Sequence, residues 1–323
     1  MFSVRSQIIS LIQRGNIPAE KIDEALTITG INPDAKSWRL FIDQLLLWLG
    51  GLSLAFAAIF FIAYNWSELG RFAKFGLVQA LIVIATTAYW KLGTENPAAK
   101  LSLLVACIFL GVLLALYGQT YQTGADPWQL FFSWAILILP WALLGRFTVI
   151  WVLWLVLLNL AIFLYYQTFR SFFWLMFDSE IELLWLFFGI NTCSLLIWEL
   201  IAKFQTWLST NWAERLLATA SGVSITWIAI HSMFSRGDTN FVGILVWIAW
   251  LVSLYFYYRK IKPELFMLAG LCTSAITIVI TFLAHKLLDD GNPGGFLFIA
   301  LLLIGMGTAA TFWLRNIHRE LQS

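Results

Sequence analysis

The polar segment 117–128 holds the densest group of side chains able to contact a ligand. It contains Gln119, Tyr121 and Gln122, and it has no Lys or Arg. Amide and phenol groups both donate and accept hydrogen bonds. These three side chains are therefore candidates to contact a ligand or to line a lumen. Otherwise they belong to a loop that folds back among the helix ends and satisfies their backbone groups.

Nearby residues belong to the same candidate motif. Asp126 precedes Pro127 and is placed to cap a helix that begins there. Asn65 and Trp66 follow the first apolar run, on the same predicted side of the membrane. Together with segment 117–128 they form a candidate polar face.

Two amides lie deep inside apolar runs. Asn159 and Asn191 fall near the centres of their runs, where an unsatisfied amide is costly. We expect both to face the interior of a helix bundle, where they either join two helices or line a polar path.

The sequence has no recognisable catalytic or metal-binding pattern. It contains no phosphate-binding glycine loop, nucleophile elbow or zinc-protease motif. His231 and His285 lack paired spacing, and the three cysteines lie inside apolar runs. We therefore predict no catalytic residue, no cofactor and no metal ion.

Charged residues avoid the centres of the apolar runs. Glu199 lies near the end of its run, four residues before Lys203. Glu264 follows Pro263 at a predicted helix start, where the helix dipole favours a carboxylate. A charge at the bilayer centre costs about 3 kcal/mol on insertion scales, so such a charge would mark function. The sequence shows none, which disfavours a proton relay through buried carboxylates.

The composition predicts a protein that faces lipid. Of the 323 residues, 60% are hydrophobic and only 12% are charged, against about 25% charged in ordinary soluble domains. The net charge of +2 is too small to indicate nucleic-acid binding. The lipid bilayer is therefore the partner that composition predicts.

Ten apolar runs approach or exceed the roughly 20 residues that a spanning helix needs. They do not alternate in polarity, so helices rather than a transmembrane barrel are expected. The predicted fold class is an all-α polytopic transmembrane helix bundle of about ten spans, at 41–64, 72–90, 101–117, 128–144, 147–166, 181–202, 216–234, 241–258, 264–284 and 296–314.

The cations are biased to one side of these spans. Of the 20 Lys and Arg residues, those on the side opposite the N-terminus are Arg71, Lys74, Arg170, Arg236 and Lys286. Cytoplasmic flanks retain positive charge during insertion. Both termini are therefore expected in the cytoplasm, and segment 117–128 is expected outside.

Residues 1–37 are expected to form a separate element. Apolar residues repeat at helical spacing around Ile8, and a second helix can begin with Pro18 and stop at Gly30. We predict a cytosolic amphipathic helical hairpin at 1–37 and a ten-span domain at 38–323. The hairpin either packs against the bundle or docks a protein partner.

Several stretches in the first part of the chain carry a resemblance to one protein family. They are 118–126, Leu130-Phe131 with Trp134, 139–143, 38–39 and 50–66. Together they resemble a family of bacterial predicted membrane proteins, domain of unknown function 2157. The resemblance covers about the first 145 residues. It implies a location in the bacterial inner (plasma) membrane, and it brings no activity, substrate or catalytic residue with it.

Three functions remain open at this point. Many spans with little mass outside the membrane favour a permease or translocator of a small or lipid-like substrate. A non-catalytic scaffold, sensor or complex subunit would instead present the N-terminal hairpin to a partner. An enzyme that modifies envelope lipids needs a nucleophile with a base, or clustered acids, and none is well placed in the sequence.

The predicted topology has a direct test. A tag in the Tyr121 loop should react only from outside the cell, and a tag at Ser323 only from the cytoplasm, because the cation bias orients the spans. Accessibility labelling of intact and permeabilised cells measures this. Both tags on one side would contradict the assignment.

Overall fold

The computed structural model describes residues 8, 11–12, 14–29, 34–65, 67–169, 181–208, 211–234, 241–288 and 293–321. Within these ranges the secondary structure is helical, and ten helices are long and apolar enough to cross a membrane. The predicted all-α polytopic bundle of about ten spans is confirmed.

The N-terminal region contains one described helical segment. The 3-10 turn η1 (Ala19–Lys21) leads into α2 (Ile22–Ile28), where the second helix of the hairpin was expected. Most of the first expected helix lies outside the described residues. The hairpin and its boundary at residue 37 therefore stay predictions.

The ten spans divide into two compact units of five. Pro33–Asp178 and Gln205–Ser209 form the α3–α7 unit, which also contains the 3-10 turn η2 (Thr206–Leu208). Its spans are α3 (Ala35–Tyr64), α4 (Arg71–Leu92), α5 (Pro97–Tyr121), α6 (Pro127–Gly145) and α7 (Thr148–Thr168).

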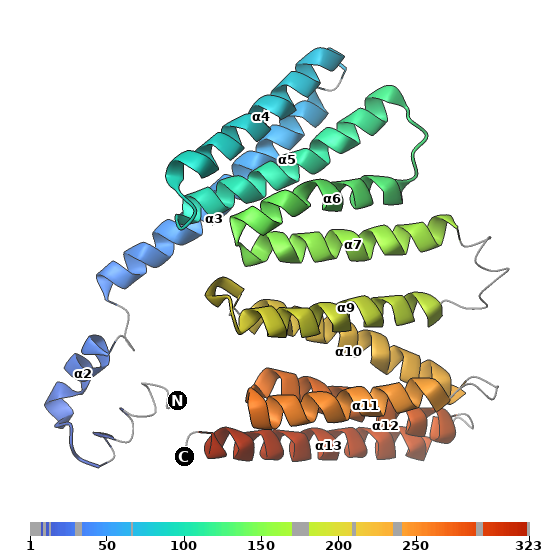
Figure 1. Ribbon diagram of the computed structural model, residues 1–323. Coiled ribbons are helices and arrows are strands. Elements are labelled where there is room, and N and C mark those ends of the chain that lie inside the picture. Colours follow the sequence, from blue (N-terminus) through green and yellow to red (C-terminus); the bar gives the residue numbers. More distant parts are fainter. Residues whose placement is uncertain are drawn as a thin grey trace. The chain divides into compact units, whose positions relative to one another are not determined.

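The second unit comprises Ser179–Phe204 and Thr210–Ser323, with which Met1–Asn32 is grouped. We call it the α9–α13 unit. Its helices, labelled in Figure 1, are α9 (Ile181–Ala202), α10 (Asn211–Phe234), α11 (Phe241–Phe256), α12 (Leu265–Leu288) and α13 (Pro293–Glu320). The π-turn η3 (Tyr257–Ile261) lies between α11 and α12.

Helix starts and stops follow local chemistry. The Asp34 side chain accepts a hydrogen bond from the Ser37 backbone at 2.8 Å and caps α3. Asn96 caps α5 in the same way, and Pro97 supplies its first residue. At the end of α4, Gly93 adopts a positive φ of 81°, which glycine tolerates without a steric penalty.

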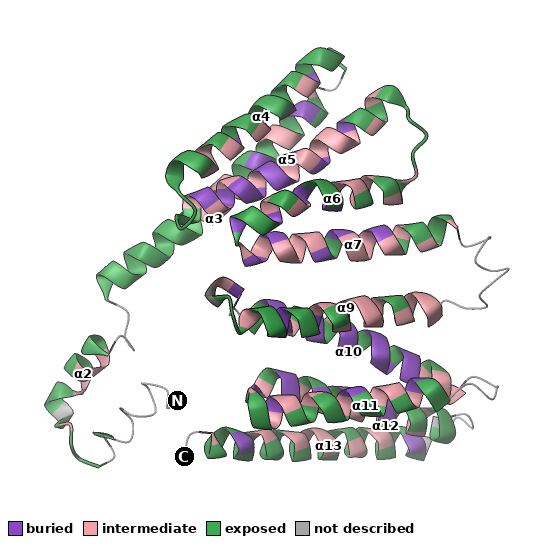
Figure 2. Ribbon diagram, viewed as in Figure 1, coloured by how far each residue is buried: buried purple, intermediate pink, exposed green. Residues whose placement is uncertain are grey.

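In the α3–α7 unit, α5 is the central helix and contacts α3, α4, α6 and α7. It carries many of the buried positions coloured in Figure 2. Gly111 of α5 leaves room for the Trp134 ring of α6, whose Nε1 donates to the Cys107 carbonyl at 2.8 Å. A small residue on one helix thus admits a large aromatic ring from the next.

In the α9–α13 unit, α10 is the central helix and contacts α9, α11 and α12, while α13 packs along α12. Ser274 of α12 joins three helices: its hydroxyl lies 2.6 Å from that of Thr226 and accepts from Trp247 Nε1 at 2.9 Å. The central helix is third of five in one unit and second of five in the other. The two units therefore differ in packing order.

Gly111 offers a test of packing in the α3–α7 unit. A Cβ at this position would lie 2.5 Å from the Trp134 ring, and overpacking of this kind costs typically about 1–3 kcal/mol. Gly111→Ala should therefore lower the thermal midpoint of the purified protein in detergent. Gly76→Ala on α4 is the matched control, because nothing lies within 4 Å of its Cβ. Equal midpoints for the two variants would contradict the packing.

Candidate functional site

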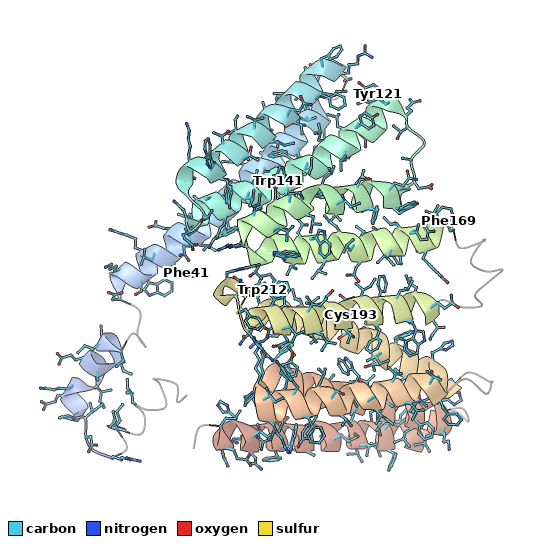
Figure 3. The ribbon with its side chains drawn as sticks, viewed as in Figure 1. Phe41, Tyr121, Trp141, Phe169, Cys193 and Trp212 are labelled. Atoms are coloured by element: carbon cyan, nitrogen blue, oxygen red, sulfur yellow. The ribbon has the colours of Figure 1, made fainter. Side chains whose placement is uncertain are left out.

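The polar segment predicted from the sequence connects α5 to α6. Gln119 and Tyr121 are exposed on the last turn of α5, and Gln122 ends that helix with a positive φ of 45°. The Tyr121 ring lies 6.0 Å from that of Phe75 and 5.0 Å from that of Tyr117. Figure 3 shows Tyr121 at this helix end. The tyrosine is thus held by aromatic contacts, while both glutamines face outward from the unit.

The other residues of the motif have local roles. Asn65 terminates α3, and its side-chain nitrogen donates to the Phe61 carbonyl at 2.9 Å. Asp126 occupies the position before α6, as predicted, but its side chain makes no capping hydrogen bond. Its backbone carbonyl accepts from the Gln129 amide instead, at 3.0 Å. Trp66 lies outside the described residues.

Each of the two deep asparagines bonds to its own helix. Asn159 donates from Nδ2 to the Leu155 carbonyl at 2.8 Å, and Asn191 donates to the Phe187 carbonyl at 2.8 Å. Asn191 is buried and Asn159 is half-buried. They belong to different units, so a common polar path remains a prediction.

The structure also gathers a charge network that the sequence analysis did not predict. It lies at one end of the α9–α13 unit, where α9 ends, α10 begins, and η3 leads into α12. Its members, which we call the ion network, are Glu199, Glu214, Arg215, Tyr257, Tyr258, Lys262 and Glu264.

Lys262 is the centre of the ion network. Its Nζ lies 3.1 and 3.2 Å from the two carboxylate oxygens of Glu199 and 2.5 Å from Oε2 of Glu214. The Glu199 side chain is 9% exposed, and that of Glu214 is 0% exposed. Two carboxylates that are almost completely shielded from solvent therefore share one ammonium group.

The π-turn supplies further donors to Glu199. The Tyr258 hydroxyl donates to Oε1 at 2.8 Å and that of Tyr257 to Oε2 at 3.1 Å. Backbone hydrogen bonds between residues five apart hold the π-turn: the Lys262 amide donates to the Tyr257 carbonyl at 3.0 Å. Two consecutive tyrosines can thereby reach one carboxylate. Such π-turns occur frequently at functional sites.

Arg215 and Glu264 form a second pair beside the first. The Arg215 Nε donates to Glu264 Oε1 at 2.7 Å, and the guanidinium lies 5.3 Å from the Phe266 ring. Two buried carboxylate oxygens in the network have no hydrogen-bond partner among the described residues: Oε1 of Glu214 and Oε2 of Glu264. The network therefore has too few hydrogen-bond donors for its buried carboxylate oxygens.

The structure gives Glu199 and Glu264 ion-pair partners that the sequence analysis did not predict. Glu199 pairs with Lys262 from a different helix end, not with Lys203 in the next turn of its own chain segment. Glu264 does precede α12, as expected, but it also pairs with Arg215. One feature of the sequence could have indicated the network. All these residues lie close to the ends of helices, and these ends fall on the same predicted side of the membrane.

The charge state of Lys262 follows from its surroundings. Burial lowers the pKa of Lys262, yet its hydrogen bonds to Glu214 and Glu199 and the charges of both carboxylates outweigh burial and raise it above the ordinary value. The side chain is therefore a cation at neutral pH. Its contribution to stability is complete below about pH 10.4, the ordinary lysine value, and is lost as pH rises through the folded pKa.

Removing this cation should destabilise the bundle. Lys262→Met leaves Glu199 and Glu214 facing each other without compensation, and breaking a buried ion pair costs about 3–5 kcal/mol. We expect a marked fall in the thermal midpoint at neutral pH. Lys260→Met is the control, because Lys260 is exposed and its ammonium group lies over the Phe256 ring, 5.4 Å from the ring centroid. Similar midpoints for both variants would show that the ion network does not stabilise the fold.

Comparison with known proteins gives one match. Residues 10–151 match a family described as "Predicted membrane protein (DUF2157)". No curated protein and no solved structure matches the chain. The matched range includes Asn65 and the α5–α6 segment but ends before the ion network, so the family does not inform the network's role. Over residues 10–151 the match confirms the resemblance seen in the sequence, to the predicted membrane proteins of domain of unknown function 2157.

Proposed function

We propose that the protein is a permease of the bacterial inner membrane that moves a small or lipid-like substrate, with both termini in the cytoplasm. The observation that supports this proposal is the ion network, which shields three carboxylates among the ends of membrane-spanning helices and pairs them with Lys262 and Arg215.

The stability of the fold alone does not require these buried carboxylates. Buried ions are expensive to desolvate, and well-packed apolar side chains of similar volume often stabilise a protein as well or better. Ionisable residues inside membrane segments therefore mark pathways of ions or substrates by default. Glu214, with a side chain that is 0% exposed, is difficult to explain as a purely structural residue.

The ion network also connects the ends of several helices. Lys262 holds Glu199 of α9 and Glu214 of α10, and it lies in the short link between η3 and α12. A change in the charge of one carboxylate alters the attraction between these helix ends. An ion network that joins several helices is thus suited to control their relative positions during transport.

The uneven distribution of Lys and Arg residues also predicts the side of the membrane on which the network lies. Arg259 of η3 pairs with Glu320 at the end of α13, so the C-terminal end of the chain lies at the network's end of the unit. If the positive-inside rule orients the spans, the network faces the cytoplasm. Substrate or ions would then reach it from that side.

A second function, a scaffold or sensor that docks a protein, is favoured by α2. None of its residues is buried, and Ile28 at its end is 77% exposed. A helix that leaves an apolar residue free can pack against a partner. Deleting residues 1–37 separates the two functions: the scaffold loses its activity in cells, whereas the permease keeps transport by the remaining spans.

Transport is tested in two stages because the substrate is unknown. Mass spectrometry of cells and medium first identifies compounds whose distribution changes when the gene is deleted. Those compounds are then assayed for flux in proteoliposomes. Purified wild-type protein should move at least one of them, and Lys262→Met should slow that flux by about tenfold or more, since each tenfold corresponds to ~1.4 kcal/mol of barrier.

Glu320→Gln serves as the matched control for this flux assay. Glu320 is also ion-paired, but its side chain is 61% exposed at the end of α13, so its loss should leave the flux nearly unchanged. Folded wild-type protein that moves none of these compounds would refute the permease, and the scaffold would then be the better account.

A further inference from the structure

We propose that the ion network binds one proton, and that Glu214 is the residue that takes it up. The starting point is the balance of charge around Lys262. Two carboxylates, Glu199 and Glu214, share this single ammonium group. The neighbouring pair of Arg215 and Glu264 is already neutral. With every group ionised, the part of the network around Lys262 has one negative charge too many.

Hydrogen bonding decides which carboxylate stays ionised. Glu199 accepts from both tyrosine hydroxyls of η3 and at both oxygens from Lys262. Glu214 accepts from Lys262 at Oε2 alone, and its buried Oε1 has no partner among the described residues. Hydrogen bonds to the charged form favour that form, and an adjacent like charge disfavours it. The proton therefore belongs on Glu214.

The groups on every neighbouring element agree with this assignment. Glu199 faces the site from α9, and Tyr257 and Tyr258 face it from η3. Lys262 and the Arg215–Glu264 pair complete the charged surroundings from the chain link, α10 and the start of α12. Because the two carboxylates interact through one ammonium group, the uptake is a property of the Glu199–Glu214 pair.

A proton fits the site better than a metal ion does. Among the described residues there is no group of three or more His, Cys, Asp or Glu side chains arranged to hold a metal ion. Lys262 and Arg215 already occupy positions that a metal ion would need. Uptake of a proton forms one O–H bond at Glu214 Oε1 and leaves Lys262 balanced against Glu199.

Proton uptake would regulate the helix contacts described above. With Glu214 neutral, Lys262 is attracted mainly to Glu199 of α9; with Glu214 ionised, it is drawn equally toward α10. That this exchange drives transport rests on the proposed function, whereas proton binding itself does not.

Infrared difference spectroscopy of the full-length protein in lipid nanodiscs tests the site. The carbonyl stretch of a protonated carboxylic acid should remain in the wild type at a pH at which exposed carboxylates such as Glu320 are ionised, and it should disappear as the pH is raised further. Glu214→Gln should remove this band. Glu320→Gln should leave it, because Glu320 is exposed and paired with Arg259.

A second variant keeps the test decisive if Glu214→Gln fails to fold. Glu199→Gln removes the competing charge and gives Lys262 to Glu214 alone, so the band should disappear at a lower pH than in the wild type. Absence of a titrating band in the wild type, or its persistence in Glu214→Gln, would overturn the proposal.

The outcomes also separate this inference from the proposed function. The band without substrate flux supports the proton site and refutes the permease. Flux without the band refutes the proton site and leaves the permease in place.

Discussion

The shared attraction of Glu199 and Glu214 to Lys262 is the constraint on which this account depends. A carboxylate that is shielded from solvent and has no partner is expensive, and here two such carboxylates share one ammonium group. The π-turn η3 and the short link that follows it place Lys262 and both tyrosine hydroxyls against Glu199. The ends of α9 and α10 are held to the start of α12 by charge as well as by packing.

Hydropathy predicted the membrane spans because lipid imposes a simple rule on each helix separately. An apolar run of sufficient length has to become a helix, whatever its neighbours are. The run at 181–202 coincides with α9, and Pro127 and Pro97 begin helices as their fixed φ favours. This rule does not predict which helices pack against one another. Nothing in the sequence indicated that α5 and α10 would be the central helices of two five-span units.

The ion network escaped prediction for the same reason. Each charge was considered on its own helix, where Lys203 is the natural partner of Glu199. The true partner, Lys262, is 63 residues further along the chain, and only tertiary structure brings them together. By contrast, the α5–α6 segment attracted notice because its polar residues are adjacent in sequence. The structure gives Tyr121 aromatic neighbours and leaves Gln119 exposed, so a ligand role for this segment is still a prediction.

A double-mutant cycle between Glu199 and Lys262 tests the central claim most directly. The free energies of unfolding of the wild type, Glu199→Gln, Lys262→Met and the double variant are measured under one set of conditions. If these side chains act as one electrostatic unit, the cycle should give a coupling energy of about 1 kcal/mol or more. Effects that add to within ~0.5 kcal/mol would mean that the two groups are independent, and the account would fail.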